Sequence, residues 1–413
     1  MFSVLAIFLN NVQITLSMKQ ILASPILKKQ VFKPLQVKKT SWHNVCAGQI
    51  ADGCQSCVLG QKLVIFITGL CGQHCWYCPV SDQKMRKDVI YANERPVHSE
   101  ADLIQEAEES GAMGAGITGG DPLVKVERCA HYTWLLKEHF GKDFHVHLYT
   151  PLQLVNEERL RILYESGLDE IRFHPYLDDK TWWPRIELAR KFPWKVGVEI
   201  PAIPGEEKAI SELIYYIKDK VDFLNLNELE VSDNLAWQEA FKTKHIKCKD
   251  NSSYGVTGSE QTAMNLIKLT AKLGLRTHFC TSKSKDAIQH GNRVKRRAER
   301  MKKPYDLVDD EGMLTRGAIY TDLVPCTNYY GILKHMPSEE KQSRLLKLSK
   351  LKQSLQKKFN IPNDLIEVDP QKLRILTGGW IVQEIHKKIK NKSAIVTEYP
   401  TWDHLEVEVG FLK

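Results

Sequence analysis

The chain has 413 residues, of which 43% are hydrophobic and 26% are charged, and its formal net charge is +8. This composition excludes a disordered chain and is ordinary for a soluble protein that buries a substantial core in one large domain and one or two smaller ones. The positive charge favours an anionic partner such as nucleic acid or a membrane surface, although a solvated basic surface is the simpler explanation.

Residues 1–40 are predicted to form a basic N-terminal arm. The first 17 residues are apolar, but they lack a basic start, contain Asn10 and Asn11, and are too short to span a bilayer. Met18 is therefore a second candidate for the start of the protein. Because no export signal accompanies the ten cysteines, we expect a cytoplasmic protein, without membrane contact, whose thiols serve as metal ligands.

Residues 41–60 form a predicted cysteine-bearing segment that packs on the core. Cys46, Cys54 and Cys57 have the spacing C-x7-C-x2-C. They could hold zinc or an auxiliary cluster that a distant residue such as Cys280 or Cys326 completes. The alternative is that these thiols are buried as small hydrophobic side chains.

A second cysteine loop follows a short apolar run that begins at Leu63. Cys71, Cys75 and Cys78 have the spacing C-x3-C-x2-C, and soft thiolates this close together select zinc or iron–sulfur centres. Three ligands leave one metal position open, as in catalytic sites. A closed zinc site with His74 as its fourth ligand is the alternative.

Short strands alternate with helices of about ten residues through the predicted core, residues 61–282. Strands are expected at 114–118, 144–150, 170–175, 195–201, 223–230 and 276–281. Helices are expected near 99–111, 127–140, 180–192, 207–220 and 261–273, with a further helix that Asn156 caps. This alternation predicts a partial or near-complete parallel β/α barrel, with functional residues at the carboxyl ends of its strands. Polar residues do end these strands: Gly119, Gly120, Asp121, Tyr149, Thr150, Arg172, His174, Glu199, Asn227, Glu228, His278 and Cys280.

The Cys-x3-Cys-x-aromatic-Cys pattern, with Tyr77 as the aromatic residue, resembles the radical S-adenosylmethionine (radical SAM) superfamily. The resemblance covers residues 63–281 and is greatest to archaeal-type proteins related to pyruvate formate-lyase activating enzyme. It implies a 4Fe-4S cluster held by Cys71, Cys75 and Cys78, and S-adenosyl-L-methionine bound beside it.

The same resemblance implies where the cofactor is bound. Gly119, Gly120 and Asp121 resemble a Gly-Gly-Glu motif whose backbone receives the methionine amino group, with Asp in place of the commoner Glu. Ile203 resembles an apolar residue that packs on adenine, although the surrounding motif departs from the family at Pro201 and Lys208. The further positions expected to bind the cofactor are Tyr77, Thr150, Arg172, His174 and Glu199.

The implied activity is reductive cleavage of S-adenosylmethionine to a 5′-deoxyadenosyl radical, with an electron donor such as ferredoxin or flavodoxin. The sequence does not decide the substrate. The chain could be an activase that acts on a glycyl-radical enzyme, or it could modify RNA or an anionic small molecule. A hypothesis of another class is a non-enzymatic metal-binding protein that binds nucleic acid.

Two further structural parts are predicted in the C-terminal third of the chain. Residues 283–304 form a basic helix in which Arg293, Arg297 and Arg300 share a face, either to track phosphates or as a solvated surface. Residues 305–413 predict a small α+β module with a long helix from Ser338 and an antiparallel strand pair. No catalytic residues stand out there, so we expect it to recognise substrate or pack as a lid.

Overall fold

The computed structural model describes residues 33–250 and 254–413, of which Pro34–Lys413 belong to one compact unit. Most of the predicted basic arm lies outside the described residues. Among the helices described, none has the length and apolar character needed to cross a membrane.

The larger sheet has eleven strands in the described part of the chain, and its central seven are parallel. These seven are β3 (Lys62–Phe66), β6 (Gly114–Thr118), β7 (His145–Thr150), β8 (Glu170–Phe173), β9 (Lys195–Ala202), β10 (Phe223–Glu228) and β11 (Thr277–Cys280). The barrel is partial, because β3 pairs next with β4 (Tyr91–Ala92) and β11 with β2 (Val45–Ala47) instead of with each other. The edges are completed by β1 (Val37–Lys39) and β5 (Arg95–Pro96). The expected partial parallel β/α barrel is confirmed.

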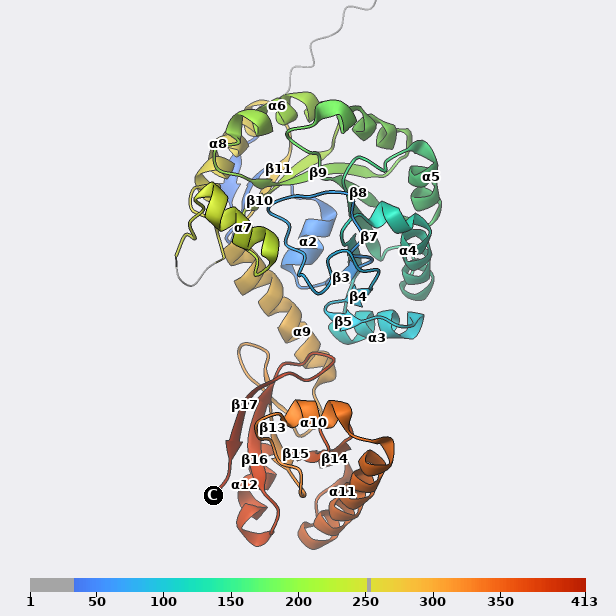
Figure 1. Cartoon of the computed structure of the whole chain (residues 1–413), viewed down its shortest axis with the longest axis vertical. Coiled ribbons are helices and arrows are strands. Elements are labelled where there is room, and N and C mark those ends of the chain that lie inside the picture. Colours follow the sequence, from blue (N-terminus) through green and yellow to red (C-terminus); the bar gives the residue numbers. More distant parts are fainter. Residues whose placement is uncertain (1–32, 251–253) are drawn as a thin grey trace, which may run out of the picture. The chain divides into compact units, whose positions relative to one another are not determined.

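Helices cover the outer face of this sheet (Figure 1). They are α3 (Glu100–Ser110), α4 (Val126–Phe140), α5 (Glu157–Glu165), α6 (Glu207–Ile217) and α8 (Ser259–Lys272), with α7 (Leu235–Lys244) and the 3-10 turn η1 (Pro122–Lys125) nearer the strand ends. Ser99 and Asp102 form the capping box that starts α3, and Asn156 caps α5. The helix expected near 180–192 is instead 3-10, η2 (Lys180–Lys191), and contains Pro184, which lacks the N–H that an α-helix needs.

The two faces of the barrel strands differ in polarity. Outward side chains such as Leu63, Ile117 and Val146 are buried against the helices in the main core. Successive side chains of a strand point to opposite faces, so Lys62 and His147, next to Leu63 and Val146, point inward, and both are polar. A short helix, α2 (Asp52–Val58), lies inside the curve of the sheet, next to β3, β6 and β7 (Figure 1). The barrel therefore encloses a polar interior with α2 packed into it.

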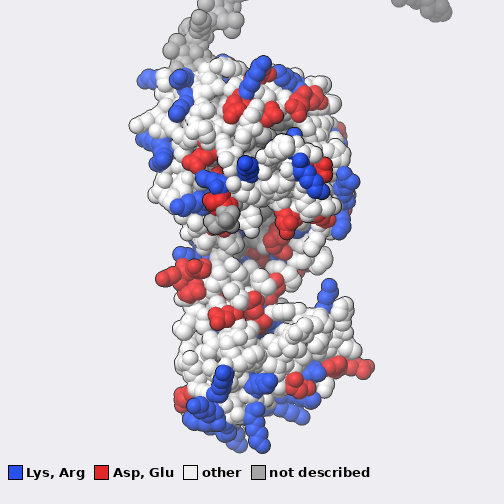
Figure 2. All heavy atoms as spheres, turned by 60° about the vertical axis from the view of Figure 1, so that its left-hand side comes forward, with Lys and Arg blue, Asp and Glu red and all other residues white. Residues whose placement is uncertain are grey.

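The basic segment forms the π-helix η3 (Ser284–His290) and α9 (Gly291–Met301). Arg297 is 5% exposed and binds Glu106 and Glu109 of α3, while Arg296 donates to Gly111 O and Arg300 to Glu108 O. These arginines join two helices instead of forming a free phosphate-binding face. On the face of the molecule drawn in Figure 2, basic and acidic side chains are interspersed over the barrel.

The C-terminal part has a second, antiparallel sheet, which has six strands among the described residues. Its order is β14 (Ile366–Asp369), β15 (Arg374–Thr377), β13 (Leu314–Ile319), β16 (Ser393–Glu398) and β17 (Glu406–Phe411), with β12 (Leu307–Val308) beside β13. Its helices are α10 (Tyr329–His335), α11 (Ser338–Phe359), α12 (Gly379–Ile385) and the 3-10 turns η4 (Asn363–Leu365) and η5 (His386–Lys388). The leucine stripe of α11 belongs to this module's core, with Leu348 and Leu355 buried. The expected α+β module is present.

Candidate functional site

The cysteine loop leaves the carboxyl end of β3. Cys71, Cys75 and Cys78 are partly buried and form no disulfide. Asn234 fastens the loop to α7: its Nδ2 donates to Cys78 O (2.8 Å) and Val80 O (3.0 Å), while its Oδ1 caps the helix. The sequence analysis missed Asn234, because its N-cap role gives no sign that it also binds the loop.

Cys75 lies among polar side chains of β8 and the segment that follows it. Its Sγ is 3.3 Å from the hydroxyl of Tyr176. Burial alone would raise the pKa of the Cys75 thiol, but hydrogen bonding and charge attraction from His174 bring it below its ordinary value. His174 Nδ1 donates to Glu199 O (2.9 Å), because a carbonyl only accepts, and His174 Nε2 lies 3.0 Å from the Tyr77 hydroxyl. The surroundings of Cys75 therefore favour its thiolate, which is the form that ligates metal, whereas burial raises the pKa of Cys71 and Cys78.

The end of β6 packs directly on this loop. Gly120 N donates to Thr68 O and Asp121 N to Leu70 O, both at 2.8 Å. A Cβ at Gly119 would lie 2.4 Å from Thr68 O, and one at Gly120 would lie 2.5 Å from Leu70 O. Gly119 also has φ of +151°, in the region that favours glycine. Only glycine at these two positions lets the strand end approach the cysteines this closely.

Asp121 and Thr150 bind each other. Asp121 Oδ1 accepts from Thr150 Oγ1 (2.8 Å) and from Leu123 N (3.0 Å), and burial raises the pKa of the Asp121 carboxyl. Both side chains are almost fully buried. They fix the end of β6 against β7 and start η1, so these side chains position the site through their neighbours.

Ile203 lies beside the loop. It is buried in an apolar cluster that includes Trp237 and against which Trp76 and Tyr77 of the loop pack. An apolar surface next to the cysteines is what the expected adenine contact needs.

Arg172 and Glu199 lie deeper, in the barrel interior. Arg172 Nε binds Glu170 Oε1 (2.5 Å), and its Nη1 binds Glu199 Oε2 (2.9 Å) and the Tyr149 hydroxyl (3.0 Å). Burial opposes ionisation of Glu199, but the Arg172 charge and two asparagine amides lower its pKa to about 2. Both residues were predicted at the cofactor; the structure places them in an ionic network deeper in the barrel, and their contact with the cofactor stays a prediction.

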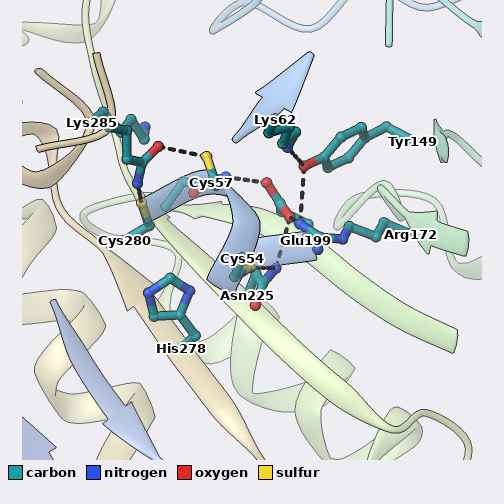
Figure 3. Close-up of a pocket in the computed structure, with 12 residues that line it drawn as sticks. Cys54, Cys57, Lys62, Tyr149, Arg172, Glu199, Asn225, His278, Cys280 and Lys285 are labelled. Carbon is teal, nitrogen blue, oxygen red and sulfur yellow. Dashed lines mark hydrogen bonds and ion pairs between the residues drawn. The ribbon is translucent and has the colours of Figure 1, made fainter. Parts of the chain in front are cut away.

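A cavity of about 150 Å³ lies in this network (Figure 3). The residues that line it come from β3, β7 to β11, α2 and η3: Cys54, Cys57, Lys62, Tyr149, Arg172, Glu199, Asn225, Asn227, His278, Cys280, Lys285 and Gln289. The sequence analysis did not single out Lys62, Asn225 or Gln289. The alternation of polar and apolar residues along the strands is the signal that could have found the two strand residues.

Three of the four cysteines predicted as a second metal site line this cavity. Cys54 accepts from Asn225 Nδ2 (3.3 Å), Cys57 donates to Gln289 Oε1 (2.9 Å), and Gln289 Nε2 donates to Cys280 (3.2 Å). Burial raises the pKa of Cys54 to about 11 and that of Cys280 to about 12, so both are neutral thiols. Cys46 lies apart from the cavity lining, on β2.

Within residues 33–250 and 254–413, no three His, Cys, Asp or Glu side chains are gathered as ligands of a metal ion. In the interior, the thiols of Cys54, Cys57 and Cys280 contact side-chain amides, and a second metal there stays a prediction. On the loop, three free thiols lie within one short segment, and one has a stabilised thiolate. That donor set fits an iron–sulfur cluster whose binding would draw the thiols together.

Comparisons with known proteins identify the family of the chain. Residues 65–176 match the model of the radical SAM superfamily, and residues 327–410 match one described as a domain of unknown function, DUF8061. The chain is 37% identical over 376 residues to a Methanocaldococcus jannaschii protein named "Putative glycyl-radical enzyme activating enzyme", covering 87% of this chain and 92% of that protein.

Solved structures show weaker similarity. Methylornithine synthase is 14% identical, with a TM-score of 0.35 over 54% of this chain and 71% of that one. Coproporphyrinogen III oxidase from Escherichia coli is 13% identical, with a TM-score of 0.35 over 55% and 57%. The fold assignment therefore rests on the strand order of the chain itself.

The M. jannaschii relative and the superfamily match decide between the two classes of function left open by the sequence, an enzyme and a non-enzymatic binding protein. The chain belongs to the radical SAM superfamily, as an enzyme related to pyruvate formate-lyase activating enzyme that works with a 4Fe-4S cluster and S-adenosyl-L-methionine.

Proposed function

We propose that Cys71, Cys75 and Cys78 hold the 4Fe-4S cluster and that S-adenosyl-L-methionine binds beside them, against Gly119–Gly120 and Ile203. The observation that carries this assignment is the meeting of the cysteine loop, the two-glycine end of β6 and His174 at one end of the barrel. Bound there, the two cofactors supply reductive cleavage of the sulfonium, which gives methionine and a 5′-deoxyadenosyl radical able to take a hydrogen atom from a substrate.

The chain's own residues prepare this site. His174 favours the thiolate of Cys75, Asn234 holds the loop on α7, and Ile203 offers an apolar surface to adenine. Asp121 and Thr150 keep the end of β6 in place beneath the loop. A one-electron donor such as ferredoxin or flavodoxin is the proposed partner.

The proposed substrate is a molecule bound inside the barrel. Activation of a glycyl-radical enzyme is the second candidate, supported by the name of the M. jannaschii relative. RNA modification has less support, because Arg296, Arg297 and Arg300 are bound to α3.

The cluster assignment is tested on anaerobically reconstituted protein, by iron content and by 5′-deoxyadenosine release after dithionite reduction. Cys75→Ala removes a ligand, and Gly120→Ala pushes β6 against the loop, so we expect each to lower both quantities at least tenfold. Cys248→Ala, an exposed thiol elsewhere, and Gly291→Ala, with open space around its Cα, are the matched controls and should behave as wild type. Wild-type iron and turnover in Cys75→Ala would refute the assignment.

A further inference from the structure

Two fully enclosed side chains of the barrel cavity have polar atoms with nothing to bind. Asn225 Oδ1 and both ring nitrogens of His278 have no hydrogen-bond partner within the described chain, although the residues are only 2% and 3% exposed. Buried polar groups are normally paired, since an unpaired one costs free energy. Something other than protein therefore completes this cavity.

Lys62 adds a cation without an ion pair to the same cavity. In the described residues its Nζ has one hydrogen bond, to the Tyr149 hydroxyl (3.0 Å), and no ion pair. The other two cations of the cavity are paired: Arg172 with Glu170 and Glu199, and Lys285 with Glu230 (2.6 Å). An ammonium group has three donor hydrogens, and one is used on Tyr149, so two are left for a ligand. An anionic ligand group would accept from both and would pair with the charge of Lys62.

The unpaired atoms also define what else a ligand must offer. Asn225 Oδ1 only accepts, so it needs a donor. Burial lowers the pKa of His278 to about 4, so its neutral ring has one donor and one acceptor nitrogen. Lys62 is on β3 and His278 on β11, the first and last of the parallel strands, and Figure 3 shows them on different sides of the pocket. A ligand that satisfies these groups therefore carries an anionic group at one end and a hydrogen-bond donor at the other.

The size and position of the cavity narrow the choice of ligand. A volume of about 150 Å³ suits a molecule of roughly the size of benzene and is too small for a polypeptide segment or a nucleotide. Arg172 is on β8 and His174 directly follows that strand, two residues further along, which is about 7 Å in extended chain. Glu199 connects the depth of Arg172 in the barrel with that of His174, because its carboxylate binds Arg172 while its carbonyl accepts from His174. The cavity is thus one layer of side chains below the cysteine loop.

We propose that this cavity is the substrate site and that it takes a small carboxylic acid bearing a hydroxyl or amino group. The carboxylate lies beside Lys62, and the hydroxyl or amino group donates to Asn225 Oδ1 or His278. The proposal rests on the function proposed above, because only the radical chemistry at the loop makes a ligand at this depth a substrate.

The test is anaerobic calorimetric titration of the reconstituted holoprotein, with S-adenosylmethionine present, using four probes. D-glycerate and L-serine combine a carboxylate with a donor, propionate has only the carboxylate, and glycerol has only hydroxyls. We expect saturable binding of D-glycerate or L-serine, binding of propionate at least tenfold weaker, and no binding of glycerol. Absence of binding by all four probes would mean that the cavity holds ordered water only and would overturn the proposal.

Two variants test whether the probes bind in this cavity. Lys62→Met removes the proposed partner of the carboxylate, and His278→Phe removes a ring that makes no hydrogen bond within the described chain, so it should fold normally. Each should weaken binding at least tenfold. The exposed controls Lys195→Met and His98→Phe should bind as wild type does. Unchanged binding in both cavity variants, with folding verified by circular dichroism, would also overturn the proposal.

Iron content and 5′-deoxyadenosine release, measured on the same samples, separate the two proposals. Normal iron and turnover without probe binding would refute the small-acid site alone. Probe binding without cofactor cleavage would refute the proposed function, and with it the role of the bound acid as a substrate.

Discussion

At the scale of single residues, Glu199 organises the barrel interior. Its carboxylate accepts from Arg172 (2.9 Å), Asn225 (2.8 Å) and Asn227 (3.0 Å), and its carbonyl accepts from His174. Burial disfavours the charged form, yet these partners lower the pKa of Glu199 to about 2. Its negative charge is therefore a stabilising feature of the folded state, since it offsets the buried Arg172.

We predict that Glu199→Gln lowers the free energy of unfolding at pH 7 by about 3 kcal/mol, because the folded pKa lies below the unfolded one. A depressed carboxyl pKa stabilises the fold above the unfolded pKa, and this stability is lost as pH falls from about 4.5 toward 2. Urea unfolding at pH 7, 5 and 3 should show the difference between wild type and variant shrinking at pH 3. A difference that stays constant with pH would contradict the lowered pKa.

The matched control for this measurement is Glu212→Gln. Glu212 is paired with Lys180 at the surface, where solvent screens the charges, so the change should have little effect on stability at any of the three pH values.

At the scale of elements, α9 is held to the end of α3 by its arginines. Arg296 Nη2 and Arg300 Nε donate to the carbonyls of Gly111 and Glu108, each at 2.7 Å. The last carbonyls of a helix lack partners within it and carry partial negative charge, so cations there are stabilising. Arg297 lies between these two residues and is buried against Glu106 and Glu109.

We predict that Arg297→Met destabilises the protein by roughly 3–5 kcal/mol, because it removes the nearer of two cations beside the buried carboxylate of Glu106 and leaves Arg95 at 3.9 Å. The double variant Arg297→Met/Glu106→Gln should recover part of this loss, since no buried charge is then left unpaired. Arg161→Met breaks an exposed pair with Glu157 and should change stability little. Urea denaturation measures all three, and a loss no larger than that of Arg161→Met would contradict the structural role of Arg297.

At the scale of the whole molecule, the barrel and the C-terminal part have separate cores. The main core contains residues from Val45 to Phe279, whereas two other clusters contain buried residues between Tyr305 and Val396. The two parts also have separate sheets. A six-stranded sheet with its own helices and core has what independent folding requires.

We predict that residues 304–413 fold when produced alone. Circular dichroism should show mixed helix and strand, and urea should unfold the fragment in one cooperative transition. Deleting residues 304–413 from the full chain should not alter the iron content of the cysteine loop, because the proposed ligands all lie in the barrel part. A fragment without a cooperative transition would show that the barrel is needed to fold it.

Several features of the fold and of the site could be predicted because they depend on local sequence. The apolar runs and helix caps gave the β/α alternation, as at Ser99 and Asn156. Pro184 shows the limit of periodicity, since a helical pattern containing it forms a 3-10 helix. Arg172 was expected at the cofactor because it is near a strand end, and its contact with the cofactor stays a prediction. Its depth in the barrel could not be read from the sequence, because two residues along a strand move an inward side chain by about 7 Å, from one layer to the next.

The sequence by itself determined the cysteine loop, the two glycines that face it and the alternation of strands and helices, because spacing and periodicity are local properties. The tertiary structure decided what those patterns enclose. Lys62 and His278 come to one cavity only through the order of the parallel strands, and the arginines of α9 are bound only because that helix packs on α3. Such contacts depend on strand order and helix packing, which join residues far apart in the chain and leave no signal in either segment alone.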